Sequence, residues 1–337
     1  MGKWFEPVRA VMFLATTGIE SDVNQLQEEI LKVYQEFKKL CDDHGLRYYA
    51  IYGTAIGAAR HQGFIPWDDD MDLFMPYSDC LALMEILHSS DQEYSISMRD
   101  RSLDEDNRAN IFKVYSKNSI FIENSACFPK NFYGVFVDLF PLIGTPETHN
   151  EREVFFTEIL RLKRDIYWNE RFVVGEKSAE IQQLLGLFSA YDYNASSKVA
   201  SPQLCLRERV FDREEFDDPI EMCFEDTTIW VPRNYDDRLT QVYGDYMTLP
   251  PESQRSGHHA TNALINFDTP YLTYTQEIES SPIKGYVDYM NGEIITLKKE
   301  VFDKDRRAKA LERPTMSQWL RFLLQAIRRK LPRLKRS

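Results

Sequence analysis

The chain has 337 residues, of which 43% are hydrophobic and 13% aromatic. That composition can bury a sizeable core in one large domain, with or without an appendage. The net charge of −12 argues against a general nucleic-acid-binding protein, which would normally carry a basic patch.

Cysteine spacing and hydropathy exclude further classes of protein. The five cysteines lie singly, with neither a CxxC pair nor a Cys/His cluster at zinc spacing. We therefore expect reduced thiols in a cytosolic protein. No run approaches the roughly 20 apolar residues that cross a bilayer. The apolar piece at 11–15 is too short for the core of a signal peptide.

The first predicted element after an ambiguous N-terminal arm, residues 1–20, is a long helix. Ser21 and Asp22 are typical of a helix N-cap, and Gly45 is typical of a helix end. Between them, apolar residues recur at helical spacing: Leu26, Ile30, Val33, Phe37, Leu40 and Cys41. We expect this helix to cover a sheet whose first strand is predicted at 47–52.

The next stretch, residues 49–76, concentrates the candidate chemistry. Gly53 and Thr54 separate the first strand from a short predicted helix, and backbone N–H groups at a helix start favour phosphate. Four carboxylates follow: Asp68, Asp69, Asp70 and Asp72. From Asp70 onward the residues alternate as in a strand, so Asp70 and Asp72 are predicted to share one face.

Neighbouring carboxylates tolerate each other when a cation lies between them. Mg²⁺ prefers oxygen ligands and often binds one or two carboxylates together with substrate phosphates. The combination of the carboxylates with Gly53 and Thr54 therefore indicates a metal and phosphate site. The alternative is a solvated acidic turn after a strand.

A lysine in a later strand is a second candidate. Ser78 is predicted to cap another helix, a strand follows at 94–98, and residues 111–123 are predicted to form a hairpin that turns near Lys117. Lys113 lies among apolar residues in the first strand of that hairpin. Such a lysine can neutralise phosphate as a point charge, or it can extend its ammonium into water from an edge strand.

A third candidate is a carboxylate inside an apolar strand. The strand predicted within 133–146 is strongly apolar except for Asp138. A lone carboxylate in such a run is costly unless it is paired or binds a metal. We favour a metal-binding or general-base role for Asp138. The alternatives are a hydrogen bond to the backbone and an ion pair with an arginine.

The remaining elements lead to a histidine pair. Helices are predicted at 151–168 and 234–244, and two short strands at 221–232. His258 and His259 could bind substrate phosphate or exchange a proton near neutral pH. They could equally be surface residues that close a loop. Zinc binding is disfavoured because no other ligand lies nearby in the sequence.

The C-terminal part departs from the α/β pattern. Residues 264–312 contain short predicted strands and are expected to form a small β-rich extension. Residues 313–337 carry an apolar stripe, and residues 314–337 contain seven Lys or Arg and no acid. This pattern is typical of a basic amphipathic helix on an anionic membrane surface. The alternative is a helix packed on the domain. We expect a cytoplasmic protein, peripheral on the inner face of the membrane.

Three stretches resemble the LicD family, which includes fukutin-like proteins. They are YGTAIGAARHQGFIPWDDDMDLFMP, the strand YGVFVDLFPLIGTP, and VPRNYDDRLTQVYGDYMTLPP with the histidines after it. The resemblance implies a nucleotidyltransferase fold, an α/β domain over residues 21–263 with a mixed sheet flanked by helices. It also implies a set of three carboxylates, which maps onto Asp70, Asp72 and Asp138.

Bacterial members of that family are linked to moving phosphocholine from CDP-choline onto cell-surface glycans. The resemblance therefore implies an enzyme that uses Mg²⁺ or Mn²⁺ to transfer a phospho-alcohol group and release CMP. The acceptor would be a hydroxyl of a glycan or its lipid-linked precursor, as in capsule, lipopolysaccharide or teichoic acid. Ribitol phosphate and phosphoethanolamine stay open as the transferred group. The alternatives are transfer of an NMP to a small acceptor, and a catalytically silent scaffold at the membrane.

The resemblance also implies roles for individual residues. The metal is expected on Asp70, Asp72 and Asp138, and Asp138 is also expected to help deprotonate the acceptor hydroxyl. Contacts to donor phosphates are expected from Gly53, Thr54, Arg60 and Lys113. Other substrate contacts are expected from Trp67, His258 and His259. A choline group needs an aromatic cage, for which the candidates are Tyr52, Trp67, Tyr133 and Trp168.

Overall fold

The computed structural model describes residues 23–90, 94–100, 112–122, 134–168, 178–202, 210–255, 257 and 264–273. The chain divides into two compact units, residues 1–281 and 282–337, and every described residue lies in the first. The predicted N-terminal arm, the C-terminal helix and most of the β-rich extension therefore lie outside the described residues and stay predictions. Within the described ranges, none of the helices combines the length and the apolar content that crossing a bilayer needs.

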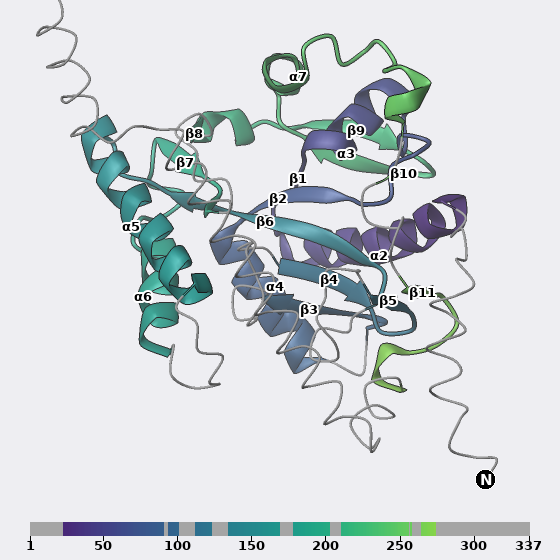
Figure 1. Cartoon of the computed structure of the whole chain (residues 1–337), viewed down its shortest axis with the longest axis horizontal. Coiled ribbons are helices and arrows are strands. Elements are labelled where there is room, and N and C mark those ends of the chain that lie inside the picture. Colours follow the sequence, from purple (N-terminus) through teal and green to yellow (C-terminus); the bar gives the residue numbers. More distant parts are fainter. Residues whose placement is uncertain are drawn as a thin grey trace, which may run out of the picture. The chain divides into compact units, whose positions relative to one another are not determined.

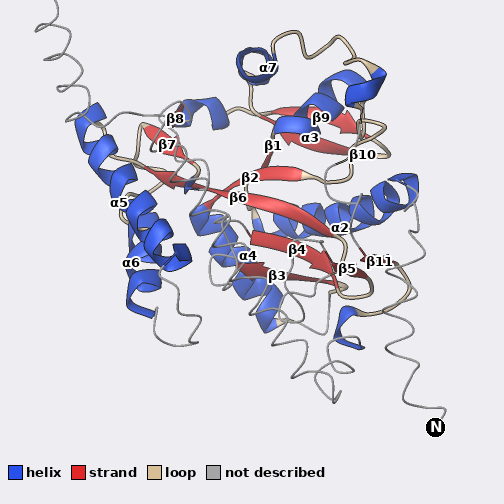
Figure 2. Cartoon of the chain, in the orientation of Figure 1, coloured by secondary structure: helices blue, strands red, loops and turns tan. Residues whose placement is uncertain are grey.

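A seven-stranded mixed sheet forms the centre of the first unit (Figures 1 and 2). Its main path runs β1–β2–β6–β4–β3, and β7 and β8 extend it from β6. The strands are β1 Tyr49–Ala50, β2 Asp72–Pro76, β3 Ile96–Asp100, β4 Phe112–Ser116, β6 Phe136–Gly144, β7 Lys198–Ala200 and β8 Val210–Asp212. β2 and β6 run parallel, whereas the other neighbours are antiparallel. The predicted mixed sheet flanked by helices is confirmed.

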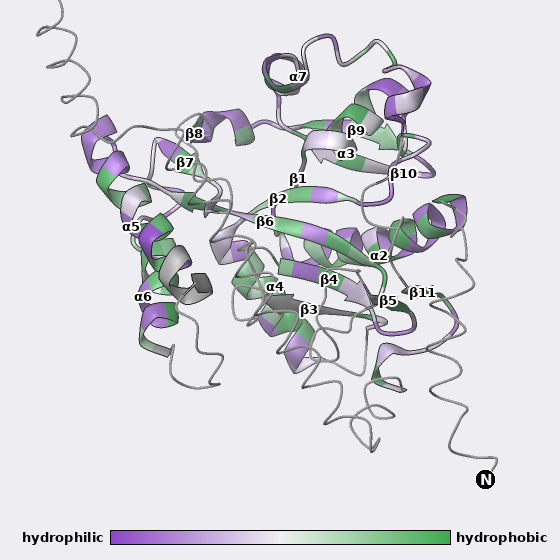
Figure 3. Ribbon diagram, in the orientation of Figure 1, coloured by the Kyte–Doolittle hydropathy of each residue, from purple (hydrophilic) through white to green (hydrophobic). Residues whose placement is uncertain are grey.

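The core is built on β6. All nine residues of this strand are buried, and Figure 3 shows hydrophobic residues along much of it. A strand that is covered on both faces carries a nearly continuous apolar sequence, which explains the run around Asp138. Each fully buried Val, Leu or Phe side chain contributes about 1.5–3 kcal/mol to stability. The exception, Asp138, therefore needs a specific partner.

Helices α2 (Val23–His44) and α4 (Tyr77–Ser89) both pack against β6. The predicted apolar face of α2 is confirmed, because its six predicted residues are all buried. Tyr34 completes that face, and its hydroxyl donates a 2.7 Å hydrogen bond to the carbonyl of Thr228. α4 begins at Tyr77, one residue before the predicted cap at Ser78, because Pro76 is the N-cap residue.

A second group of elements lies around β1 (top of Figure 1). It consists of α3 (Tyr52–Ile56), a π-helical turn (Gly57–His61), the hairpin β9 (Ile220–Phe224) and β10 (Thr227–Val231), and α7 (Tyr235–Tyr243). The hairpin contacts both β1 and the π-helical turn, and α7 contacts α3. The hairpin and α7 therefore pack against the segment between β1 and β2, which carries the predicted site.

Other elements follow the predictions less closely. α5 (His149–Trp168) confirms the predicted helix and pairs with α6 (Ser178–Phe188). A turn is present at Lys117, but β5 (Ile120–Ile122) pairs with β11 (Leu264–Asn266) and not with β4. The expected simple hairpin is therefore wrong. The remaining short elements are 3-10 turns at Arg213–Phe216 and Glu252–Gln254.

The strand predicted at 47–52 is shorter than expected. β1 ends at Ala50, and α3 already begins at Tyr52, whose φ is +48°. A positive φ at a bulky residue is uncommon and costs energy, so packing must hold it. The Tyr52 ring lies edge-on to Phe74 and Phe140, at centroid distances of 6.2 and 6.0 Å. The reversal at Tyr52 brings Gly53 and Thr54 into the first turn of α3.

Candidate functional site

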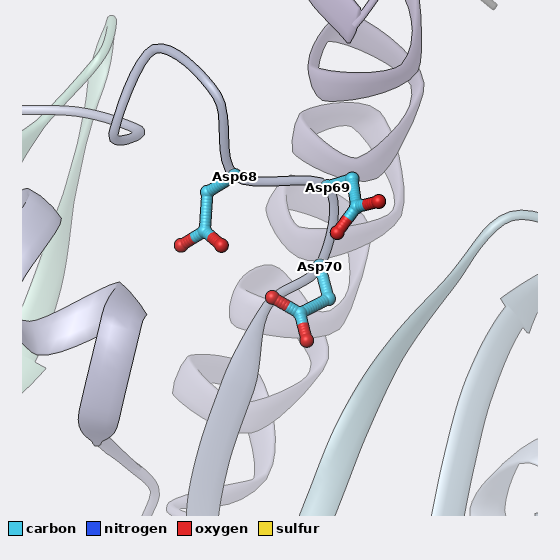
Figure 4. Close-up of side chains that lie close together, drawn as sticks. All are labelled: Asp68, Asp69 and Asp70. Atoms are coloured by element: carbon cyan, nitrogen blue, oxygen red, sulfur yellow. The ribbon is translucent and has the colours of Figure 1, made fainter. Parts of the chain in front are cut away.

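Three consecutive carboxylates form an acidic loop, defined as Asp68, Asp69 and Asp70, immediately before β2 (Figure 4). One oxygen from each lies within 4.8 Å of the other two. Asp69 is buried, with 2% of its surface exposed, and the other two are half-buried. β2 begins only at Asp72, so Asp70 belongs to the loop, and the expected strand alternation from Asp70 is not formed.

Two distant elements fix the chain that leads into the acidic loop. Gln27 of α2 donates hydrogen bonds through Nε2 to the carbonyls of Ile65, at 3.0 Å, and Asp68, at 2.8 Å. In the turn between β9 and β10, Glu225 accepts a 2.8 Å hydrogen bond from the Phe64 amide. Backbone positions before and inside the loop are therefore set by residues that are remote in the sequence.

The Gly-Thr pair of α3 positions the carboxylates from the other side. A Cβ at Gly53 would lie 2.6 Å from Oδ2 of Asp68, so any larger residue at this position would displace that carboxylate. The buried hydroxyl of Thr54 accepts a 2.8 Å hydrogen bond from the amide of Asp72. These two predicted phosphate-binding residues thus contact the acidic segment itself.

A row of charged side chains crosses the sheet at one level. Asp72 on β2 is in register with Asp138 on β6, and Asp138 is in register with Lys113 on β4. Nζ of Lys113 lies 2.7 Å from Oδ1 of Asp138, and the two side chains are only 1% and 7% exposed. The same ammonium lies 3.1 Å from the ring centroid of Phe136. The buried carboxylate is therefore paired with a lysine, where the sequence had suggested a metal, a backbone contact or an arginine.

The row clarifies the position of Lys113. β4 lies between β6 and β3, so this lysine is not on an edge strand and does not extend into water. Its ammonium is buried against Asp138 and is not presented at the surface for a phosphate. The structure brings Asp72 and Asp138 together as predicted neighbours, whereas Asp70 groups with the acidic loop.

The carboxylates fit a hard divalent cation. The acidic loop offers three carboxylate oxygens that lie close to one another. Asp72 follows the loop in the sequence and is in register with Asp138 on the neighbouring strand. Carboxylate oxygens suit Mg²⁺ and Mn²⁺ better than they suit softer metals. A cation bound at Asp138 would compete with the ammonium of Lys113 for the same carboxylate.

A basic and aromatic group lies beside the acidic loop. Arg60 donates through Nε to Nε2 of His61, at 3.0 Å, and through Nη1 to the carbonyl of Tyr246. Burial and the positive charge of Arg255 lower the pKa of Arg60. Burial and the charge of Arg60 lower the pKa of His61.

Trp67 connects this basic group to the acidic loop. The guanidinium carbon of Arg255 lies 5.2 Å from the centroid of the Trp67 ring, and His61 meets the ring edge-on at 6.4 Å. Trp67 directly precedes Asp68, and the backbone of Gly257 lies against the carboxylate of Asp69. Arg255 was not among the predicted site residues; the signal for it was its place just after the third family-like segment.

The second predicted group of substrate residues is only partly described. His258 and His259 lie outside the described residues, as does Tyr133. Trp168 ends α5, and its side chain is also outside the described part. Of the four residues proposed for an aromatic cage, Tyr52 and Trp67 can therefore be placed, and they lie on different elements.

Tyr52 lines a pocket of about 460 Å³ between β1, α3 and α7. Six aromatic residues contribute to its wall: Tyr52, Phe74, Phe211, Phe216, Tyr235 and Tyr243. Its polar side is an ion pair in which Nε of Arg238 donates a 2.9 Å hydrogen bond to Oε2 of Glu215. The sequence had indicated only Tyr52 of this pocket, because the other walls come from segments that meet only in the fold.

Comparison with known proteins relates the part of the chain that carries the site to one domain family. The LicD/FKTN/FKRP nucleotidyltransferase domain matches residues 45–184, a range that contains the acidic loop and the Asp72–Asp138–Lys113 row. The chain is 25% identical over 260 residues to the lipopolysaccharide cholinephosphotransferase LicD of Haemophilus influenzae. The matched region covers 70% of this chain and 95% of that protein.

Two uncharacterised rickettsial proteins match shorter stretches. One from Rickettsia prowazekii is 31% identical over 115 residues, covering 32% of this chain and 43% of its own length. One from Rickettsia typhi is 36% identical over 64 residues, covering 18% of this chain and 21% of its own length. The domain match and the similarity along most of the Haemophilus influenzae protein agree: residues 45–184 of this chain are similar to the LicD/FKTN/FKRP nucleotidyltransferase domain.

Proposed function

We propose that this protein transfers a phospho-alcohol group, with phosphocholine as the first candidate, from a CDP-alcohol to a hydroxyl of a cell-surface glycan or its lipid-linked precursor. The observation that carries the proposal is the similarity along 95% of a lipopolysaccharide cholinephosphotransferase. The carboxylates gathered at the start of β2 and on β6 support it, because they could hold a divalent cation that compensates the negative charge of the donor phosphates.

The proposed transfer forms one P–O bond, breaks another and moves one proton. The acceptor oxygen attacks the phosphorus that bears the alcohol, forming a new P–O bond, while the P–O bond to CMP breaks. The acceptor proton passes to a carboxylate, for which Asp138 is our candidate. Lys113, whose ammonium lies 2.7 Å from Oδ1 of Asp138, fixes the position of that carboxylate.

Asp70 and Asp72 are our candidates for holding Mg²⁺ or Mn²⁺, with Asp138 adjacent to Asp72 across the sheet. Such a cation, when bound, would neutralise charge on the donor diphosphate and on the leaving CMP. The chain's own contribution is positional. The hydroxyl of Thr54 holds the amide of Asp72, and Gly53 leaves space for Asp68.

The aromatic pocket beside Tyr52 is our candidate for the organic part of the donor. Its walls are mainly apolar, and one ion pair, Glu215 with Arg238, supplies polar contacts. Ligand sites commonly combine apolar walls with a few fixed polar groups. Tyr52, which lines the pocket, directly precedes Gly53 and Thr54 in the sequence, and these two residues contact the acidic segment.

The test is a donor panel. Purified full-length protein is incubated with Mg²⁺ and CDP-choline, CDP-ethanolamine or CDP-ribitol, with and without cell-surface glycan, and CMP release is followed. Glycan-stimulated CMP from one donor would establish the reaction and identify the alcohol. Pyrophosphate release from an NTP, without CMP from any donor, would instead indicate NMP transfer. Failure of both reactions, together with failure to bind CDP-alcohols, would leave a non-catalytic scaffold.

A further inference from the structure

Two arginines beside the acidic loop lack an acidic partner among the described residues. Arg60 bonds to His61 and to the Tyr246 carbonyl, and Arg255 donates through Nε to the Pro250 carbonyl, at 2.8 Å. Five other arginines with described side chains pair with carboxylates: Arg47 with Asp79, Arg161 with Glu158, Arg213 with Asp217, Arg233 with Asp218 and Arg238 with Glu215. Arg152 instead donates to the backbone carbonyls of Pro146 and Glu147. What distinguishes Arg60 and Arg255 is that two half-buried guanidiniums without a carboxylate partner lie beside each other, in a chain with 53 acidic residues.

The two guanidiniums also act on each other. The charge of Arg255 is one of the two causes that lower the pKa of Arg60, the larger being burial. Like charges held close together in a half-buried setting favour the arrival of an anion, which would relieve the repulsion. A hydrogen bond to a backbone carbonyl fixes each guanidinium in place: Arg60 donates to Tyr246 and Arg255 donates to Pro250.

The anchoring leaves the right atoms available. Arg255 is bound through Nε, and its two terminal nitrogens make no hydrogen bond within the described part of the chain. Its guanidinium carbon lies 5.2 Å from the centre of the Trp67 ring. Contact with an aromatic ring stabilises a guanidinium while its edge stays available to an oxyanion. A fixed fork of donors matches the geometry of phosphate.

We propose that Arg255 and Arg60 form a clamp for the diphosphate of the donor, with Trp67 holding the plane of Arg255. The proposal deepens the function proposed above and rests on it for the identity of the nucleotide. The location supports it, because Trp67 directly precedes Asp68 and the backbone of Gly257 lies against Asp69. The clamp and the acidic loop would then share one substrate, whose phosphates lie between them.

The experiment measures binding by calorimetry at fixed ionic strength, in Mg²⁺, with two probes: CDP and inorganic pyrophosphate. The variants are Arg255→Ala and Arg255→Lys, with Arg233→Ala as the matched control, because Arg233 is an exposed arginine paired with Asp218. Arg255→Ala should weaken both probes roughly 10- to 100-fold, since hydrogen bonds between charged groups are lost. Arg255→Lys should restore only part of the affinity, because the fork is replaced by a point charge.

The outcomes separate this inference from the proposed function. Loss of pyrophosphate binding in Arg255→Ala, with no CDP-alcohol turned over by the wild type, would retain the clamp and reject the CDP-alcohol reaction. Wild-type affinity for both probes in Arg255→Ala would overturn the clamp, as would a wild-type protein that binds neither probe. An equal loss in Arg233→Ala would show a general charge effect and would also overturn it. Thermal melting of each variant establishes that the fold is intact.

Discussion

Replacing Lys113 by methionine tests the buried ion pair directly. The substitution keeps a long apolar stem and removes only the ammonium, which lies 2.7 Å from Oδ1 of Asp138. Both side chains are almost fully buried, so the carboxylate would be left without its cation in a low-dielectric surrounding. Removing one partner of a buried pair costs about 3–5 kcal/mol. We expect a loss of this size in the free energy of unfolding.

The reciprocal change, Asp138→Asn, should cost a similar amount, because it leaves the ammonium uncompensated. In the double variant neither charge remains, so the loss should be smaller than the sum of the single losses by roughly 0.5–3 kcal/mol. Urea unfolding at pH 7.5, with comparison of the slopes, supplies the numbers. Lys198→Met is the matched control, since its pair with Asp212 is largely exposed and should contribute below about 1 kcal/mol.

Two results would refute this reasoning. A loss below about 1 kcal/mol in Lys113→Met would equal that of an exposed pair. Strict additivity of the cycle would show that the two side chains do not share an interaction. The cycle also bears on the metal proposal: Lys113→Met should be stabilised by added Mg²⁺ more than the wild type, because a cation could then replace the ammonium.

Three further predictions concern the site. Asp72→Asn should abolish metal-dependent CMP release while leaving the melting temperature nearly unchanged, because Asp72 is half-buried; surviving activity would disprove its role. Val242→Trp should raise the KM for the donor with little effect on folding, because Val242 lines the aromatic pocket and is 52% exposed; an unchanged KM would place the donor elsewhere. Folding lowers the pKa of His61 below its ordinary value of about 6.5. As the pH falls below about 6.5, the unfolded chain takes up a proton at His61 before the folded protein does, so the free energy of unfolding decreases as the pH decreases. His61→Gln should lose less stability between pH 7 and 5 in urea titrations, and identical pH profiles would contradict this.

The sequence predicted what depends on local pattern. The apolar spacing that identified α2 and the unbroken apolar run that identified β6 are signals carried by neighbouring residues. The two short strands predicted at 221–232 are present as β9 and β10, and the helix predicted at 234–244 is present as α7, with Gly244 as its C-cap. The mixed sheet and the identity of Asp72 and Asp138 as neighbouring positions followed once the family resemblance was added.

The rest depended on tertiary contacts that no local pattern encodes. The pairing of Lys113 with Asp138 follows from the register of two antiparallel strands, and a shift of one residue would have faced them apart. Asp70 joins the acidic loop because Gln27 and Glu225 hold the preceding chain in place. Arg255 meets Trp67 only through the path of the chain after α7, so no local pattern predicted that contact.

The parallel pairing of β2 with β6 also orders events during synthesis. Between these neighbouring strands the chain makes α4, β3, β4 and β5, so the ribosome delivers the acidic loop long before it delivers Asp138. Until β6 has been synthesised, Asp138 is not available to pair with Lys113, and β4 lacks the strand that pairs with it on the side away from β3. Pairings between distant segments form slowly because a large loop must close first. Nascent chains therefore cannot bring Asp72 and Asp138 side by side before β2 pairs with β6, and these two carboxylates meet in the same late step in which the sheet closes.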